Sequence, residues 1–175
     1  MSQGAALNRF LAEVERSAFH LARAAVRDPD EALDIVQDTM FTLARKYGSK
    51  PSDEWRPLFF RILQNRIRDW HRRTAVRRQV VFEAVIDGVD QIDRADGQAS
   101  SNPMERTRIE RATDRLQTAV ETLPLRQQQA FLLRSIEGMN VAETASVMRC
   151  SEGSVKTHYS RAVHTLRDAL EGYWS

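Results

Sequence analysis

Residues 138–161, GMNVAETASVMRCSEGSVKTHYSR, decide how the rest of the chain is interpreted. Asn140 followed three residues later by Glu143 is typical of a capping box, and Gly138 is placed to end a preceding helix. An apolar stripe at helical spacing follows, and it breaks at residues 150–153, a short stretch that contains Gly153. A second helical pattern comes next. Two helices joined by a tight turn predict a helix-turn-helix.

The second helix of such a motif enters the DNA major groove and reads base edges with its N-terminal residues. Val155, Tyr159 and Ala162 recur at i, i+4 and i+7 and are expected to face inward. The polar side chains left for contacts with DNA are Lys156, Thr157, His158, Ser160 and Arg161. Spacing alone leaves an alternative, which is an ordinary helical hairpin with a solvated charged face.

Composition sets the outer limits for the fold. The chain has 175 residues, 42% of them hydrophobic and 29% charged, which suits one globular domain or two small ones. Sparse Gly and Pro favour helices. The formal net charge of +2 excludes a polycation, and the single cysteine, Cys150, excludes an internal disulfide and a multi-cysteine zinc site. No apolar run is long enough for a bilayer and no signal-peptide pattern is visible, so we expect a reducing intracellular compartment.

The second helix of the chain is predicted to start at Asp28, which can cap it, with Pro29 at its first position. One face of this helix is apolar, and the other carries Asp34, Gln37 and Asp38. A solvated surface and a docking face for a basic partner explain these three side chains equally well.

A third helix is predicted after residue 53, and its polar side is strongly basic. Asn65 lies among the basic residues Arg61, Arg66, Arg68, Arg72, Arg73, Arg77 and Arg78. Arginines interleaved with Trp55, Phe60 and Trp70 are typical of a surface that binds single-stranded nucleic acid, where cations follow the backbone and flat rings stack on bases. In the alternative, the three aromatic residues are core and the arginines only solubilise.

The composition of the chain changes at residues 79–106. Acidic residues gather there, and the stretch ends in a segment that contains Gly, Ser and Pro. We interpret them as an acidic flexible linker without secondary structure, either a solvated tether or a segment that occupies a nucleic-acid groove. Helical patterning resumes near residue 104, and two helices there can cover the helix-turn-helix as a four-helix module. The predicted fold is all-α, with two helical domains joined by the linker.

Four motifs resemble one family, the extracytoplasmic-function (ECF) RNA polymerase sigma factors. Residues 31–40, EALDIVQDTM, resemble the family's DAEDLVQETF signature, and residues 58–65, LFFRILQN, resemble its WLYRIAxN helix. Residues 123–131, LPLRQQQAF, resemble its LPxxxRxxF motif, and residues 153–162, GSVKTHYSRA, are similar to its GTVKSRxxRA recognition helix. The motifs occur in family order. Four positions depart from the family patterns, namely Leu33, Leu58, Gln128 and His158.

The resemblance implies a domain plan and a set of partners. Residues 1–78 would be sigma region 2, residues 79–106 the linker, and residues 107–175 sigma region 4. Asp34, Gln37 and Asp38 would bind the clamp helices of the largest subunit of core polymerase, and region 4 would bind the flap of the second largest. The −10 element would be engaged by Asn65, Arg61, Arg66, Arg68, Arg72 and Arg73, and the −35 element by the recognition helix. The linker would thread the polymerase channel.

The resemblance also implies a cytoplasmic bacterial protein that is held inactive by an anti-sigma factor, with no cofactor, no metal and no membrane insertion. The rival is a helix-turn-helix regulator that acts without polymerase, but no βα alternation of a receiver domain occurs before residue 104. An enzyme is disfavoured, because His20, His71, His158 and His164 lack metal-ligand spacing and no phosphate-binding glycine loop is present.

Overall fold

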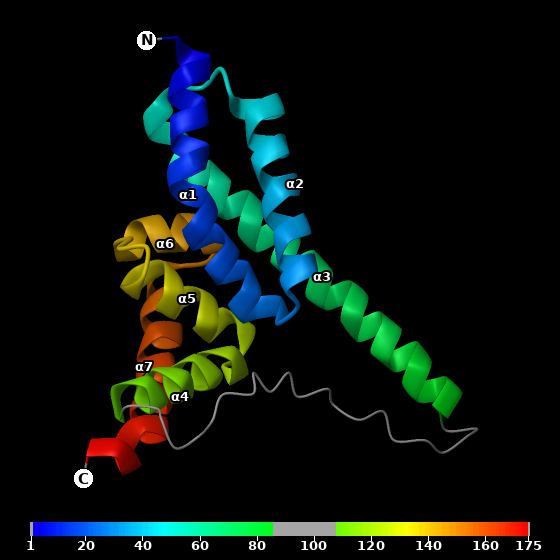
Figure 1. Cartoon of the computed structure of the whole chain (residues 1–175), viewed down its shortest axis with the longest axis vertical. Helices are drawn as coiled ribbons and strands as arrows, with labels where there is room; N and C mark the ends of the chain where they lie inside the picture. Colours follow the sequence, from blue (N-terminus) through cyan, green and yellow to red (C-terminus); the bar gives the residue numbers. More distant parts are fainter. Residues whose placement is uncertain (1, 86–107, 175) are drawn as a thin grey trace.

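The computed structural model describes residues 2–85 and 108–174, and within these ranges the chain forms helices without strands (Figure 1). The N-terminal half consists of α1 (Gln3–Val26), α2 (Pro29–Tyr47) and α3 (Ser52–Val85). The C-terminal half consists of α4 (Arg108–Thr122), α5 (Leu125–Ser135), α6 (Val141–Met148) and α7 (Glu152–Trp174). The all-α prediction is confirmed for the described residues. No described helix is both long and apolar enough to cross a bilayer.

The junction between α1 and α2 follows its sequence signals. The Asp28 side chain caps α2 by accepting from the backbone N–H groups of Asp30 (2.9 Å) and Glu31 (3.3 Å). Pro29 is the first residue of α2, where its missing N–H costs nothing. α1 ends at Arg27, which takes the left-handed conformation (φ 63°) and donates its N–H to the Arg23 carbonyl. This tight end lets α2 turn back along α1.

The core of the N-terminal half contains two of the three aromatic residues that were candidates for base stacking. Trp55 is 2% exposed and Phe60 is fully buried, so the nucleic-acid interpretation of these two rings is wrong. The Trp55 indole N–H donates to the Tyr47 carbonyl (3.1 Å), and the Phe60 ring meets Phe59 edge to face. Their position in the α3 sequence places them on its inward face. Trp70 is half-buried.

The helix α3 is longer than expected. It continues to Val85, seven residues into the stretch that we expected to be linker, and its end projects beyond the other helices (Figure 1). The sequence between Pro57 and Gly88 contains no Gly or Pro, so no helix-breaking residue interrupts it. The acidic character that suggested a linker begins before the helix ends. The rest of the predicted linker, residues 86–106, lies outside the described residues.

The helix-turn-helix is formed by α6 and α7, and the capping box predicted for α6 is present. The Asn140 side chain accepts from the Glu143 N–H (2.8 Å), and the Glu143 carboxylate accepts from the Asn140 N–H (3.0 Å). The break between the two helices lies close to where the sequence predicts it, since α6 ends at Met148 and α7 begins at Glu152. Arg149 takes the left-handed conformation (φ 54°) at the end of α6, and Gly153 lies inside α7. Ser151 caps α7 by accepting from the Ser154 N–H (3.0 Å).

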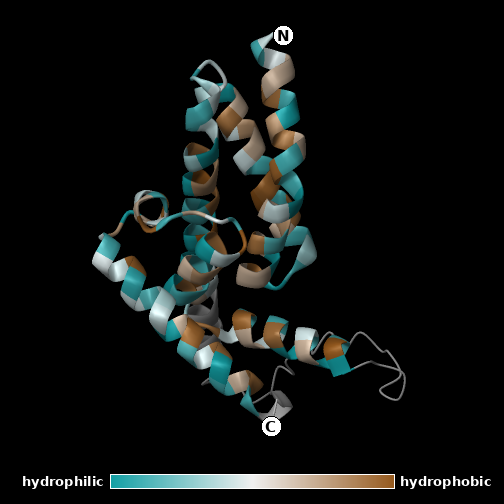
Figure 2. Cartoon of the chain, turned by 90° about the vertical axis from the view of Figure 1, so that its left-hand side faces the viewer, coloured by the Kyte–Doolittle hydropathy of each residue, from teal (hydrophilic) through white to brown (hydrophobic). Residues whose placement is uncertain are grey.

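The two halves share one buried cluster, which we call the shared core. Hydrophobic and hydrophilic residues alternate along the helices, as amphipathic packing requires (Figure 2). From the N-terminal half the shared core takes side chains such as Phe59, Phe60 and Leu63 of α3. From the C-terminal half it takes Met139, Val147 and Met148, among others. A second, smaller cluster lies between α4 and α7. The halves are therefore packed together.

Candidate polymerase and nucleic-acid interfaces

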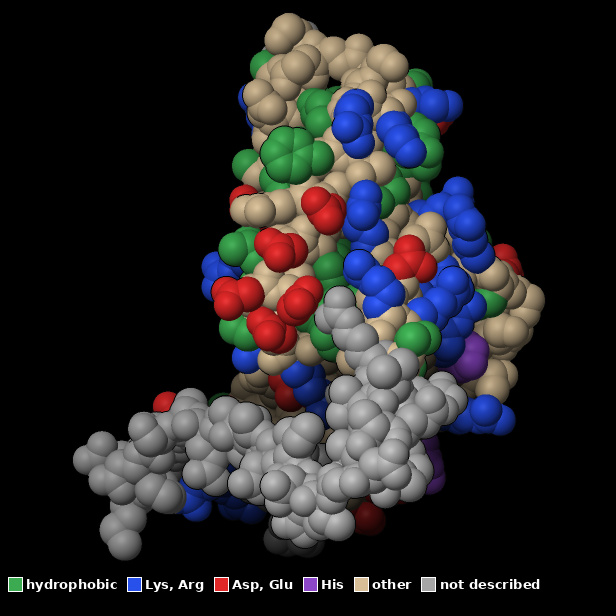
Figure 3. All heavy atoms as spheres, turned by 90° about the vertical axis from the view of Figure 1, so that its right-hand side faces the viewer, with side chains coloured by type: hydrophobic (Ala, Val, Ile, Leu, Met, Phe, Trp, Pro, Cys, Tyr) green, Lys and Arg blue, Asp and Glu red, His purple; other side chains and the backbone are tan. Residues whose placement is uncertain are grey.

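The polar face of α2 is solvent-exposed at all three residues that the sequence singled out. Asp34, Gln37 and Asp38 are exposed, and we call them the docking face. Two exposed apolar side chains flank it, namely Phe41, which is 73% exposed, and Leu33, which is 42% exposed. Figure 3 shows acidic side chains gathered beside a band of Lys and Arg on the side formed by α2 and α3. The negatively charged docking face therefore lies beside an exposed aromatic ring, Phe41, which no sequence motif singled out.

A groove of about 430 Å³ separates the docking face from the arginines of α3. Its lining is Ile35, Asp38, Arg66, Asp69, Arg72 and Arg73. The Arg66 guanidinium lies 3.9 Å from the Asp38 carboxylate and donates to the Thr42 hydroxyl (2.6 Å). Arg72 lies 3.7 Å from Asp69, and both side chains are more than half exposed. Three of the arginines predicted for −10 DNA therefore line one groove.

The other predicted −10 residues have different neighbours. Asn65 accepts from the Arg68 guanidinium through its side-chain oxygen (2.7 Å). Burial lowers the pKa of Arg68, and the nearby cations Arg126 and Arg149 of the C-terminal half lower this pKa further. Arg61 lies away from the groove, because its guanidinium donates to the hydroxyl of Ser146 in α6 (2.8 Å). The predicted set is thus divided between an open groove and the junction of the two halves.

The outer face of α7 is exposed where the sequence predicts it. Lys156, Thr157, Ser160 and Arg161 are exposed, whereas Val155 and Ala162 are fully buried. Tyr159 is half-buried and stacks on the Phe131 ring with 6.4 Å between the ring centroids. This packing fixes the rotation of α7 about its axis. The polar side chains at its N-terminal end are free of the core.

His158 differs from its neighbours on α7, because it is half-buried. Burial lowers its pKa, and the cations Arg126 and Arg161 lower the pKa further, which favours the neutral imidazole. The Arg126 guanidinium is held in place by the Met148 carbonyl (2.9 Å). A second hollow of about 430 Å³ runs beside α7 and is lined by Gln127, Ser160, Arg161, His164 and Thr165.

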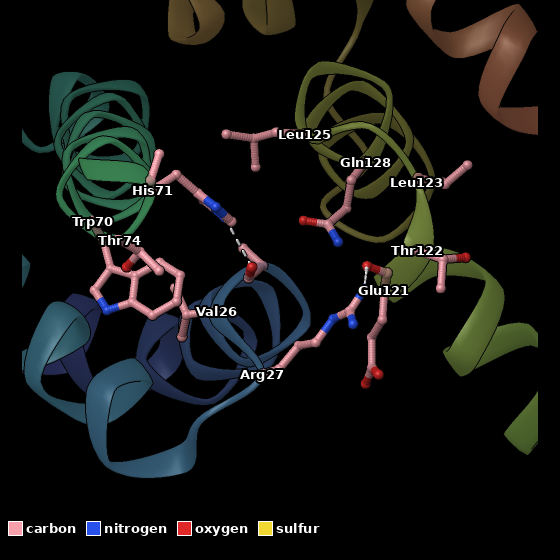
Figure 4. A pocket seen from close by; sticks show the side chains of 12 residues that line it. Val26, Arg27, Trp70, His71, Thr74, Glu121, Thr122, Leu123, Leu125 and Gln128 are labelled. Carbon is pink, nitrogen blue, oxygen red and sulfur yellow. Dashed lines mark hydrogen bonds between the residues drawn. The ribbon is translucent and has the colours of Figure 1, made fainter. Parts of the chain in front are cut away.

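A cleft of about 530 Å³ lies between the halves, and no sequence pattern predicted it. Figure 4 shows Trp70, His71 and Thr74 of α3 on one side and Gln128 with the α4–α5 corner on the other. The end of α1 lies between these two sides of the cleft. There the Ala25 carbonyl is hydrogen-bonded to the His71 ring (2.9 Å). Residues of four helices, α1, α3, α4 and α5, meet here, so no periodicity within one helix could have found the cleft.

Two family models match this chain, and each corresponds to one half. The model described as sigma-70 region 2 matches residues 10–77, and the model described as sigma-70 region 4 matches residues 113–166. Together they cover more than half of the 175 residues. The chain belongs to the sigma-70 family. Curated relatives that it matches are named as ECF RNA polymerase sigma factors, which identifies it as an ECF member.

Relatives of this sigma factor are distant in sequence. It is 28% identical to the ECF RNA polymerase sigma factor BldN of Streptomyces coelicolor over 79% of its own length and 50% of that protein. It is also 28% identical to SigM of Mycobacterium tuberculosis, over 84% of its own length and 68% of that protein. The chain thus spans only half the length of the first of these relatives.

Two solved structures share the fold of this sigma factor. One is the sigma factor RpoE in complex with the anti-sigma factor NepR from Bartonella quintana, with a TM-score of 0.66, 21% identity, and coverage of 94% of this chain and 96% of that one. The other is CnrH in complex with the cytosolic domain of CnrY, with a TM-score of 0.64, 20% identity, and coverage of 95% and 88%. At these identities the likeness establishes the fold alone.

Proposed function

We propose that this sigma factor docks on bacterial core RNA polymerase and directs promoter-specific transcription initiation. The observation that carries the proposal is the presence of both sigma regions, in family order, with the docking face and the outer face of α7 both exposed. Such a protein supplies recognition and is not an enzyme. It would act in the bacterial cytoplasm, where polymerase and promoter DNA are.

The docking face is proposed to bind the clamp helices of the largest polymerase subunit. Its two carboxylates favour a basic partner surface, and electrostatic complementarity speeds and orients association. Phe41, which is 73% exposed, would supply an aromatic anchor beside the charges, and buried aromatic side chains often carry much of the binding energy in an interface. Region 4 would make the second contact, at the flap of the second largest subunit.

The groove between α2 and α3 is proposed as the −10 interface. Arg66, Arg72 and Arg73 line it and would contact phosphates, together with Arg61 and Arg68 from the neighbouring surface. Reading the −10 element requires a base to leave the stack. This costs a few kcal/mol of free energy, which contacts in the pocket must offset. Asn65 would contribute to that pocket, since its amide can both donate and accept.

The outer face of α7 is proposed to read the −35 element. Arg161 can bind guanine through two hydrogen bonds, and Lys156 can bind phosphate. Thr157, Ser160 and His158 would supply further hydrogen bonds. An anti-sigma factor is proposed as the regulator of this sigma factor, as the two structural neighbours are complexes with the anti-sigma factor NepR and with the cytosolic domain of CnrY.

The proposal is tested by reconstitution. The full chain is added to bacterial core polymerase, and run-off transcripts are sequenced from a library of promoters that vary at both elements. We expect transcripts that need both core polymerase and this chain and that share a −10 and a −35 sequence. Specific DNA binding without any dependence on polymerase would instead identify a helix-turn-helix regulator.

A further inference from the structure

The cleft between the halves has the size and the lining of a site for a small molecule. Its volume is about 530 Å³, and pockets for small ligands measure roughly 300–1,000 Å³. Apolar side chains form much of its wall, among them Val26, Trp70, Leu123 and Leu125. None of the residues predicted to bind polymerase or promoter DNA lines this cleft. The proposed function therefore leaves the cleft without a role.

Gln128 supplies a hydrogen-bond acceptor to this cleft. The residue is 3% exposed, and its side-chain N–H groups donate to the carbonyls of Ala24 (3.0 Å) and Val120 (3.1 Å). Carbonyl oxygens can only accept, so the amide nitrogen must face these two groups and the amide oxygen must face the other way. Figure 4 shows this oxygen pointing into the cleft, toward His71. Both N–H groups of the amide are used within the chain, and the oxygen is the atom left for a ligand.

This acceptor belongs to the chain and not to the family pattern. The motif LPxxxRxxF has Arg at the position of Gln128. Arginine carries five N–H donors and no acceptor, so it could not accept a hydrogen bond from a ligand. The departure at Gln128 thus changes what the cleft can recognise.

The opposite wall of the cleft is aromatic and comes from α3. Trp70 is half-buried, and its ring meets the His71 ring edge to face, with 5.0 Å between the ring centroids. The hydrogen bond to the Ala25 carbonyl (2.9 Å) holds the His71 ring in place. Thr74 lies one turn further along α3 and adds a hydroxyl group to this wall. Such a wall suits a flat ring, since aromatic side chains stack on the faces of nucleic-acid bases.

Arg27 places a positive charge at the edge of the cleft. This residue is exposed, and its guanidinium donates to the Glu121 carbonyl. That acceptor is neutral, so the charge of Arg27 remains available to an anionic group. Hydrogen bonds between a guanidinium and a phosphate are stronger than bonds between neutral groups. The cleft therefore combines a flat apolar wall, one acceptor and a cation at its edge.

We propose that this cleft binds a purine nucleotide that carries an amino group on its base. The base lies against the α3 wall, its amino group donates to the Gln128 oxygen, and its phosphate lies near Arg27. A purely apolar molecule would leave the Gln128 oxygen unpaired, and a free phosphate would leave the aromatic wall unused. The nucleotide is a ligand in addition to polymerase and promoter DNA, and the proposal does not rest on the proposed function.

The test titrates the full chain with AMP and with GMP and follows the heat of binding by isothermal titration calorimetry. Both nucleotides carry an amino group, and a preference between them identifies the base. Purine riboside 5′-monophosphate is the ligand control, because it lacks only the amino group of AMP. It is expected to bind about tenfold more weakly than AMP, because the Gln128 oxygen stays unpaired. This comparison uses the wild-type chain, so it does not depend on a variant that folds.

Two substitutions test the edge and the wall of the cleft. Arg27→Gly should weaken AMP roughly threefold to tenfold and leave adenosine, which lacks the phosphate, unchanged. Glycine readily adopts the left-handed conformation of residue 27 (φ 63°). Arg149→Gly is the matched control, because it removes the same charge at another left-handed position (φ 54°) that does not line the cleft. Thr74→Phe should fill the cleft and abolish binding of AMP and adenosine, with circular dichroism to verify that the helices are kept.

Three outcomes would overturn the proposal. The first is that neither AMP nor GMP binds the wild-type chain at millimolar concentration. The second is equal affinity for AMP and purine riboside 5′-monophosphate, and the third is AMP binding that survives Thr74→Phe. None of these measurements uses polymerase or promoter DNA. Failure of the nucleotide site would therefore leave the proposed function standing, and failure of polymerase docking would leave the nucleotide site standing.

Discussion

Asp38 is the residue at which the docking face and the −10 groove meet. Its carboxylate is exposed on α2 and lies 3.9 Å from the Arg66 guanidinium. An exposed pair at this distance contributes little to stability, so the function of Asp38 is separable from the fold. Asp34 shares the exposure of Asp38 but has no such neighbour in the groove lining. Substitutions at the two aspartates can therefore separate an effect on polymerase docking from an effect on the groove.

We expect both Asp34→Arg and Asp38→Arg to weaken core-polymerase binding by about tenfold or more, because each reverses the charge that meets a basic partner. Asp38→Arg should in addition raise salt-dependent binding of −10 DNA, since it replaces a carboxylate with a cation in a groove proposed to contact phosphates. Affinity is measured by fluorescence anisotropy, and Glu15→Arg, an exposed charge reversal on α1, is the control. Unchanged affinity in both α2 variants would show that this face does not dock.

Arg161 and Lys156 differ in what they can read on DNA, although both are exposed on α7. A bidentate arginine–guanine contact contributes about 1–3 kcal/mol of discrimination, whereas a lysine on phosphate adds salt-dependent affinity for any sequence. Arg161→Ala should therefore flatten the preference among −35 variants, and Lys156→Ala should weaken all of them alike. Binding is measured at several salt concentrations, with Arg167→Ala, further along α7, as the control. Wild-type preference and salt slope in Arg161→Ala would exclude Arg161 as a reader.

At the scale of elements, local sequence signals predicted the starts of α2 and α6 correctly, whereas composition misplaced the end of α3. Asp28 with Pro29, and Asn140 with Glu143, were readable because a cap is decided by residues three apart. The end of α3 was misplaced because acidic composition was weighed above the lack of Gly and Pro before Gly88. The rings of Trp55 and Phe60 were misassigned for a related reason, since a helix that is both apolar and basic does not reveal which ring faces inward.

The capping box should matter more for α6 than for a longer helix, because α6 has only eight residues and each backbone N–H at its start is a large share of its hydrogen bonds. Asn140→Ala is expected to lower the free energy of unfolding by about 1 kcal/mol. Urea unfolding followed by circular dichroism measures it, and Glu15→Ala on α1 serves as the comparison. A loss no larger than that of Glu15→Ala would mean that packing on α3 and α7 holds α6 without its cap.

At the scale of the whole molecule, the sequence predicted two helical modules and could not predict that they pack together. The Arg56–Glu137 ion pair joins residues 81 positions apart, and the Gln128–Ala24 hydrogen bond joins residues 104 positions apart. Hydrophobic periodicity reports which face of a helix is buried, but it does not report which other helix covers that face. The cleft between the halves was missed for the same reason.

The shared core leads to an expectation about unfolding. Because α6 and α3 bury side chains against each other, the free chain should unfold in one cooperative transition, with equal calorimetric and van't Hoff enthalpies. Arg56→Gln should lower the temperature of this transition, because it leaves the buried Glu137 carboxylate without its cation. Differential scanning calorimetry makes the measurement, with Lys50→Gln as control, because the Lys50–Glu54 pair is about half exposed. Two transitions already present in wild type would show that the halves fold independently.

The buried faces of α3 and α6 have a consequence for the lifetime of the protein in a cell. A chain whose halves separate would present apolar side chains such as Met148 and Val147 to water, and such surfaces aggregate and attract chaperones and proteases. The packed halves hide these side chains. Variants that weaken the packing of α6 on α3 should therefore be degraded faster than wild type, which would lower their steady-state amount in the cell.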